Sequence, residues 1–337
     1  MKSRFLVNSL LLFALSTSFC NVCLSEQVPT NKSATTIQVA AHAEAIGAKA
    51  VSEKKQDSLF KPIPFYAKYK ISLDKESHFD ESINEVNGTL EITVEEKDDV
   101  WVVQQKSVLY IYYKGKEAAD RYDLTIASWE SKNGKRYEFY VRSIVNDEAV
   151  DEVIFKGDGE FIDGQQSCVN LKRIEFNQEE QKTIVLPRDT VFPLKHLHIL
   201  VEEALKGNMV VGHKKVFDGS SDAQDIVEVD AYITPKNNYK MNINTAANST
   251  TDPASIELAQ RLENAKAWQI KMNVFALGSR DDSDPEYTYT QTVNSLGVPV
   301  SMKIKYPEPE FTVNIVMTDF SKAHLISGTP FDSKPTQ

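Results

Sequence analysis

Residues 65–73 read FYAKYKISL, and apolar residues occupy every second position of this stretch. Residues 89–95, TLEITVE, alternate in the same way. Successive side chains of a β-strand point to opposite faces, so a period of two indicates a strand with one buried face. Both stretches are therefore predicted to be strands, and the second is expected to begin after the turn-forming pair Asn87-Gly88.

The same pattern recurs along most of the chain. Further runs rich in aromatic and β-branched residues cover residues 100–113, 122–129, 137–145, 150–155, 168–176, 183–186, 209–217, 226–233, 268–277, 287–293, 298–306 and 311–320. Asn133-Gly134 separates two of these runs, and Asn-Gly favours the type I′ turn of a β-hairpin. Hairpins join antiparallel strands, whereas parallel strands need long crossovers. The predicted fold class is therefore mainly all-β, with a large antiparallel sheet of roughly fourteen strands.

Two segments are predicted to be helices. The first, Pro193–Lys206, has proline in its first turn, is followed by Gly207, and carries leucines at helical spacing. The second, Asp252–Lys266, has Asp252 as its capping residue and proline directly after it. Its apolar face is weak, so this helix is expected on the surface, after a long loop over residues 235–251.

The composition is that of a globular protein. Of the 337 residues, 41% are hydrophobic and 26% are charged, which excludes a disordered or collagen-like chain. Asp and Glu outnumber Lys and Arg by 48 to 38, which gives a formal net charge of -10. An acidic chain is a poor partner for nucleic acid, so we expect no nucleic-acid ligand.

The N-terminus is typical of a secretory signal peptide. Lys2 and Arg4 form a basic region, Phe5–Leu15 is mostly apolar, and small and polar residues follow. This apolar run is shorter than the ~20 residues that a transmembrane helix needs. We expect a cleavable signal peptide over residues 1–25, a flexible linker over 26–58, a folded domain over 59–325 and a C-terminal tail over 326–337. The mature protein is expected to be exported and to have no transmembrane span.

The three cysteines have different expected roles. Cys20 and Cys23 lie in the signal region, and one alternative to simple cleavage makes either of them the lipidated first residue of a lipoprotein. Cys168 is then alone in the folded domain and cannot form an internal disulfide. We interpret Cys168 as a small hydrophobic residue within a strand, with a catalytic thiol as the alternative.

The sequence contains no familiar catalytic or metal-binding motif. His196 and His198 are two positions apart, and such positions do not share a helix face, so no metal site is expected. The acidic stretches 218–222 and 281–286 lack the spacing of an EF-hand loop, and G-x-S-x-G, Walker and G-x-G-x-x-G patterns are absent. We expect no catalytic residues, no enzyme activity and no cofactor. The alternative hypothesis is a secreted hydrolase whose active-site residues are scattered along the chain.

Three blocks of sequence carry a resemblance to a known family. They are VFPLKHL at residues 191–197, ALKG at 204–207 and VFDGS at 216–220. Together with the first and last predicted strands, they resemble the EipB-like periplasmic envelope-integrity family of alphaproteobacteria over most of residues 60–325. The resemblance implies a periplasmic, non-enzymatic protein that supports cell-envelope integrity. It also implies an open antiparallel β-spiral, or broken barrel, with short helices.

The chain departs from the family pattern at the cysteines. The resemblance implies a disulfide between a cysteine near residues 97–99 and another near the C-terminus. Here Asp98-Asp99 occupies the first position, and the last strands contain no cysteine. The disulfide that is usual in the family is therefore not expected.

The family motifs supply the candidate binding residues, and two interpretations of them are open. In the first they are structural, with a proline leading from strand to helix and Asp218 closing a turn. In the second, the helix and the turn border a groove for an envelope lipid or a periplasmic or outer-membrane protein. We expect a monomer. The candidates are Phe192, Pro193, His196, Phe217, Asp218, Gly219 and Ser220.

Overall fold

The computed structural model of this chain describes most of the predicted folded domain. It describes residues 60–76, 82–146, 148, 152–162, 166–219, 226–237, 253–279, 284–307 and 310–323. The predicted signal peptide, linker and C-terminal tail lie outside the described residues, as do Cys20, Cys23, Asp252 and Ser220.

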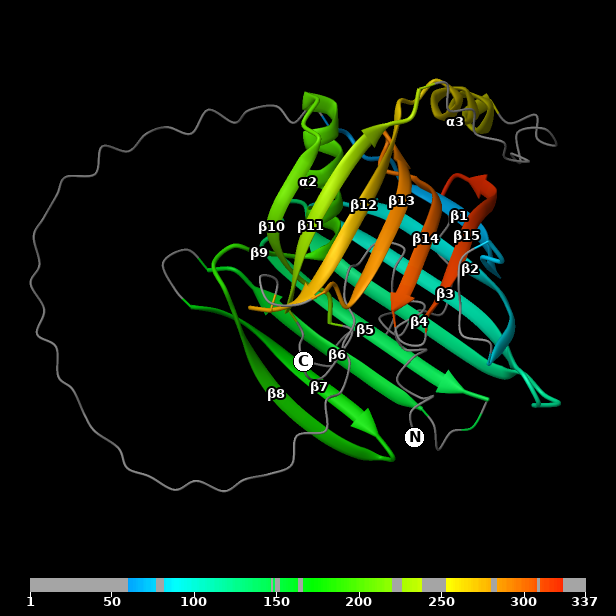
Figure 1. The fold of residues 1–337 in the computed structure, drawn as a ribbon. Helices are drawn as coiled ribbons and strands as arrows, with labels where there is room; N and C mark the ends of the chain where they lie inside the picture. The colour runs from blue at the N-terminus through cyan, green and yellow to red at the C-terminus, as the bar shows by residue number, and fades with distance from the viewer. Residues whose placement is uncertain are drawn as a thin grey trace, which may run out of the picture.

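The described residues form fifteen strands in one sheet, which confirms the predicted class. The strands are β1 (Phe65–Leu73), β2 (Ile83–Lys97), β3 (Val100–Tyr113), β4 (Asp120–Ser131), β5 (Arg136–Val145), β6 (Val153–Glu160), β7 (Ser167–Glu175), β8 (Gln178–Leu186), β9 (Thr190–Val191), β10 (Val210–Phe217), β11 (Ile226–Pro235), β12 (Ala267–Ala276), β13 (Tyr287–Asn294), β14 (Pro299–Pro307) and β15 (Glu310–Ser321). Neighbouring strands pair antiparallel except β9 and β10, which pair in parallel. Figure 1 shows the sheet curving round on itself.

The first and last described strands pair in the middle of the sheet. β1 pairs with β2 on one side and with β15 on the other. The sheet order therefore runs from β8 through β1 and β15 to β9, and its two edges are strands that follow each other in the sequence. The result is a nearly closed, barrel-like sheet with one seam, between β8 and β9.

Three strands differ from the predicted ones by several residues. One is β6, which ends at Glu160 rather than at residue 155. The expected turn at Asn87-Gly88 is wrong, because these residues lie inside β2 and pair with Tyr110 and Leu109 of β3. Glycine suits this position for a different reason: a Cβ on Gly88 would lie 2.3 Å from the carbonyl oxygen of Val108. β8 starts five residues earlier than predicted, at Gln178, because pairing with β7 holds a polar stretch in the sheet.

Helix α2 (Pro193–Lys206) has the predicted boundaries and lies on the inner side of the sheet. Pro193 occupies the first turn, and Gly207 ends the helix in the left-handed conformation, with φ 87°. In Figure 1, α2 lies behind β10 and β11. Its buried residues face the strands, so the helix fills part of the space that the sheet encloses, and it also connects the parallel pair β9 and β10.

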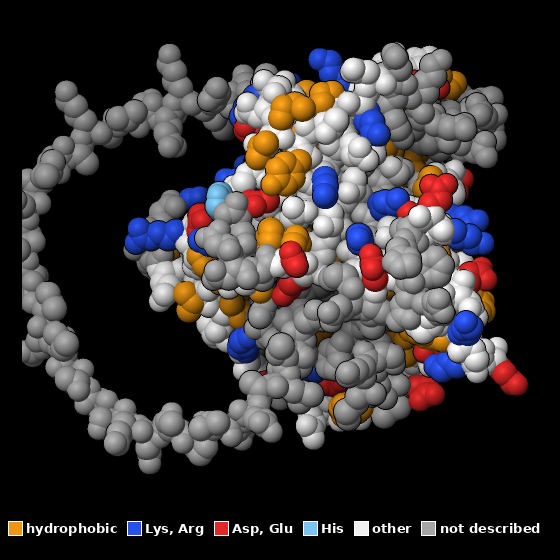
Figure 2. Space-filling view, viewed as in Figure 1, with side chains coloured by type: hydrophobic (Ala, Val, Ile, Leu, Met, Phe, Trp, Pro, Cys, Tyr) orange, Lys and Arg blue, Asp and Glu red, His pale blue; other side chains and the backbone are white. Residues whose placement is uncertain are grey.

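Helix α3 (Pro253–Glu263) and most of the described charged side chains lie on the surface of the protein. α3 confirms the second predicted helix; Ile256 on it is exposed, as a surface helix requires, whereas Leu262 is buried. On the face shown in Figure 2, Lys and Arg side chains are interspersed with Asp and Glu. Hydrophobic side chains gather at the upper left of that view, over α2, β10 and β11, where Met209, Val210 and Tyr232 are exposed.

Candidate functional site

The sequence-predicted residues at the start of α2 lie in an aromatic cluster. Phe192 is fully buried, and its ring stacks on Tyr137 of β5 with the ring centroids 4.9 Å apart. The ring of Phe161 lies at the same distance on Phe192. Pro193 is buried directly after it. The contacts of Phe192 thus join the seam end of the sheet to β5, which precedes it by more than 50 residues.

The VFDGS motif block packs against the same strand. Phe217 is fully buried, and its ring lies edge-on to Phe139, with centroids 5.8 Å apart. Gly219 has φ +77°, and a Cβ there would lie 2.5 Å from the Phe139 ring. The Tyr137 hydroxyl donates a hydrogen bond of 3.1 Å to the carbonyl oxygen of Asp218. The structure therefore brings the two motif blocks together through β5. We call Tyr137, Phe139, Phe192 and Phe217 the aromatic clamp.

Glu130 is a central residue that the sequence analysis did not identify. Its carboxylate accepts hydrogen bonds from the backbone N–H groups of Leu194 (2.8 Å) and Lys195 (2.7 Å), at the start of α2. These N–H groups have no partner within the helix, and Phe192 provides no side-chain cap. Burial raises the pKa of the Glu130 carboxyl to about 8, although the two N–H donors act in the opposite direction. Glu130 on β4 thus caps the start of α2, although it precedes Leu194 by 64 residues in the sequence.

His196 and His198 are held in apolar surroundings rather than in a polar site. His196 is 3% exposed, and its Nε2 has no hydrogen-bond partner among the described residues. The ring of His198 lies edge-on to Phe60 and to Trp101. Burial, and then a nearby lysine, lowers the pKa of each imidazole to about 4. Both side chains are therefore neutral at pH 7. His196 is buried as a core residue is, whereas His198 is half-buried against two aromatic rings.

A separate feature of the surface could bind a ligand. It is a hollow of about 560 Å³ on the outer face of β5, β6, β7 and β8. We call it the outer hollow. A volume of this size falls within the range of small-molecule sites. Its lining residues are Glu138, Phe139, Tyr140, Lys156, Gly157, Asp158, Asn170, Leu171, Lys172, Gln181, Lys182 and Thr183.

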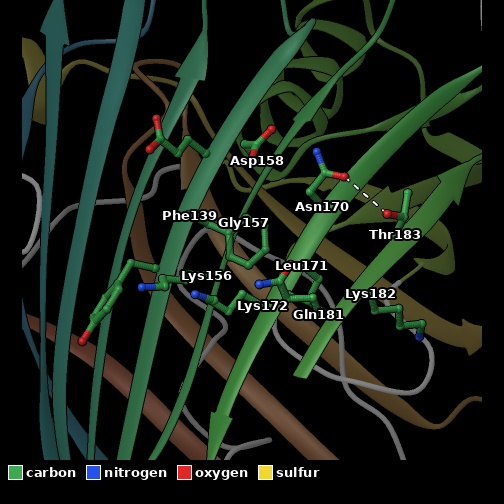
Figure 3. Close-up of a pocket in the computed structure, with 12 residues that line it drawn as sticks. Phe139, Lys156, Gly157, Asp158, Asn170, Leu171, Lys172, Gln181, Lys182 and Thr183 are labelled. Atoms are coloured by element: carbon green, nitrogen blue, oxygen red, sulfur yellow. Dashed lines mark hydrogen bonds between the residues drawn. The ribbon is translucent and has the colours of Figure 1, made fainter. Parts of the chain in front are cut away.

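The strand register arranges the polar residues of the outer hollow in two rows. One row, across the four strands, is Tyr140, Lys156, Lys172 and Gln181. The other row lies two residues along each strand and is Glu138, Asp158, Asn170 and Thr183. Figure 3 shows Asp158, Asn170 and Thr183 near one another, and Lys156 and Lys172 reaching a different part of the hollow. The outer hollow thus has a basic end and an acidic end.

The electrostatics of the outer hollow follow from these rows. Partial burial, together with the charge of Asp158 directly opposite, raises the pKa of the Glu138 carboxyl. Lys172 forms an ion pair with Glu179, outside the lining, and that contact lowers the pKa of Glu179. Asn170 accepts a 3.4 Å hydrogen bond from the Thr183 hydroxyl. His196 does not line this hollow, so the hollow does not join it to a carboxylate and a nucleophile, as the hydrolase hypothesis requires.

Neither metal ligands nor a membrane helix stand out in the part of the chain that the structure describes. Within it, no three His, Cys, Asp or Glu side chains are grouped so as to hold a metal ion. The two described helices also fall short of the length and apolar character that a membrane crossing requires.

The chain has relatives among protein families and solved structures. The EipB-like family matches residues 56–323. The chain belongs to the EipB-like family. A solved structure from Brucella abortus, described as a β-barrel-like protein of a domain of unknown function, matches with a TM-score of 0.62 and 19% sequence identity. The match covers 79% of this chain and 100% of that chain, and at this identity it shows a shared fold. A search of curated proteins found no match.

Five of the candidate residues from the EipB-like motifs lie in or beside the aromatic clamp, namely Phe192, Pro193, Phe217, Asp218 and Gly219. The outer hollow lies on the other face of β5 and shares Phe139 with the aromatic clamp, and none of its residues was predicted as a site. Cys168, on β7, is a free and half-buried cysteine. No second cysteine lies among the described residues. In this EipB-like chain, Lys97 ends β2, and Asp98 and Asp99 form the turn between β2 and β3.

Proposed function

We propose that this EipB-like protein is a non-enzymatic periplasmic protein that supports cell-envelope integrity by binding an envelope lipid or protein partner at the outer hollow. The observation that carries the proposal is the hollow itself, where charged, amide and hydroxyl groups from four strands converge. A small number of placed polar groups in a concave site is what fixes a ligand's orientation.

Two further features support the proposal. The sequence begins with a basic and then apolar segment that is typical of an exported protein, and an envelope role is what the EipB-like resemblance implies. The inner side of the sheet around α2 is occupied by the aromatic clamp and the buried face of the helix. The outer face of β5 to β8 therefore offers the more accessible binding surface.

The test of this proposal blocks the outer hollow with a bulky side chain, so that it applies whatever the ligand is. Thr183 is exposed on β8 and lines the hollow, so Thr183→Trp places a large ring there. Thr89, exposed on β2 and outside the lining, provides the matched control Thr89→Trp. Each variant is expressed in cells that lack the protein, and detergent survival is measured beside the amount of periplasmic protein.

We expect Thr183→Trp to accumulate normally in the periplasm and yet fail to protect cells from detergent, whereas Thr89→Trp protects them. Full protection by Thr183→Trp would place the binding surface elsewhere. If cells without the protein resist detergent as well as wild-type cells do, the envelope role itself is refuted. Recovery of the protein in the cytoplasm would refute the periplasmic location.

A further inference from the structure

The two polar rows of the outer hollow carry opposite charges at a defined separation. Lys156 and Lys172 pair across β6 and β7, and Glu138 and Asp158 pair across β5 and β6. The rows are two residues apart along the strands, which corresponds to roughly 6.8 Å. Side chains two residues apart point to the same face, so the outer hollow presents both charges to a single ligand.

The charges at both ends of the outer hollow are incompletely matched within the protein. Glu138 and Asp158 are like charges in directly opposite positions, an arrangement that destabilises a sheet. Neither forms an ion pair with a described residue. At the other end, the single carboxylate of Glu179 pairs with Lys172 and also interacts electrostatically with Lys156, so one negative charge faces two lysines. A cation between the two carboxylates would relieve their repulsion, and an anion would complete the partners of Lys156.

From this arrangement we infer that the outer hollow binds a zwitterion with a phosphate and a primary ammonium, namely the phosphoethanolamine head group of an envelope lipid. The phosphate lies at Lys156 and Lys172, where charge-assisted hydrogen bonds are available. The ammonium lies between Glu138 and Asp158. The inference rests on the proposed function, because it specifies the ligand of the same hollow.

A simple anion fits the outer hollow less well than a zwitterion does. Glu138 and Asp158 repel a ligand that carries negative charge alone, since the two rows are two residues, or roughly 6.8 Å, apart along the strands, which is within the Debye length of about 8 Å at physiological salt. Attraction at one end and repulsion at the other gives selectivity between ligands. Loss of a carboxylate charge should therefore weaken the binding of a zwitterion and strengthen the binding of phosphate alone.

The test uses soluble probes and substitutions that remove one charge each. O-phosphoethanolamine and inorganic phosphate are titrated by NMR into the mature wild-type protein, Lys156→Gln and Asp158→Asn. Lys271→Gln, at an exposed position on β12, is the matched control. All three substituted residues are exposed, and thermal melting verifies that each variant is folded.

Lys156→Gln should weaken both probes, by about 1.5- to 5-fold, as expected for an exposed charge pair. Asp158→Asn should weaken O-phosphoethanolamine by a similar factor and strengthen phosphate. Lys271→Gln should change neither dissociation constant. If Asp158→Asn strengthens both probes, the hollow is an anion site and the inference is overturned. Absence of saturable shifts at the hollow residues in the wild-type protein also overturns it.

A second arm distinguishes a lipid from a soluble source of the head group. The protein should float with vesicles of phosphatidylglycerol that contain phosphatidylethanolamine, and less with phosphatidylglycerol alone. Binding of the soluble probe without this difference overturns the lipid source. If Thr183→Trp loses detergent protection although neither probe nor vesicle binds, the head-group inference fails and the proposed function stands.

Discussion

Replacing the buried histidine of α2 with leucine should make the stability of the protein less sensitive to acid. His196 is 3% exposed, and burial lowers its pKa from 6.5 to about 4. Between these two pH values the unfolded chain binds a proton at this side chain and the folded protein does not. Stability is therefore fully present above pH 6.5 and is lost as the pH falls toward 4.

The size of this effect follows from the pKa shift. One pKa unit corresponds to about 1.36 kcal/mol, so the wild-type protein should lose about 2 kcal/mol at His196 between pH 7.5 and pH 5, and about 3 kcal/mol by pH 4. His196→Leu removes this contribution, along with a buried nitrogen that has no partner among the described residues. Other titrating groups, including His198 and Glu130, remain in both proteins and cancel in the difference.

Urea unfolding at pH 7.5, 6, 5 and 4.5 measures this difference. The free energy of unfolding of His196→Leu, relative to that of the wild-type protein at the same pH, should rise by about 2 kcal/mol between pH 7.5 and pH 5. Leu200→Ala, at a position 1% exposed in the same helix, is the control: it lowers stability at every pH without changing the slope. Equal losses for wild type and His196→Leu over this range would refute the argument from burial.

The same position separates the two interpretations of the family motif. If His196 is only a core residue, cells that express His196→Ala should survive detergent in proportion to the amount of periplasmic protein. A normal amount of protein with lost protection would instead place His196 in a binding site. Protein level and survival are measured in the same cultures.

Two further predictions concern the elements around α2, and a third concerns Cys168 on β7. Phe192→Ala and Phe217→Ala should each lower the free energy of unfolding by about 3–5 kcal/mol, because both rings are fully buried in the aromatic clamp; a loss below about 1 kcal/mol in urea unfolding would contradict that packing. Glu130→Ala should cost about 2–5 kcal/mol, since it leaves unpaired two N–H donors of α2, one buried and one partly buried, and Glu130→Gln, which keeps one acceptor, should cost less in the same assay. The melting temperature of the monomeric mature protein should not change with a thiol reductant, because Cys168 alone cannot close a loop; a drop would mean that a cysteine of the signal region is retained.

Local patterns in the sequence were sufficient to predict most of the strands and both helices. Alternation with a period of two predicted the strands, since neighbouring side chains of a strand face opposite sides wherever it lies in the fold. Pro193 and Gly207 predicted both ends of α2 because their effects depend on the backbone within one turn. The pattern failed at β8, where the first six residues are exposed on both faces and show no alternation. It also failed at Gly88, whose role is close contact with a neighbouring strand rather than a turn.

The tertiary structure alone decided how these elements meet. The pairing of β1 with β15, the capping of α2 by Glu130 and the aromatic clamp all join residues that are far apart in the sequence. Such contacts depend on strand register and on how the sheet closes, and single-residue patterns carry neither. The same reason explains the outer hollow. Lysines on β6 and β7, and carboxylates on β5 and β6, look like ordinary surface charges in the sequence, and only the register of four strands sets them in two opposed rows.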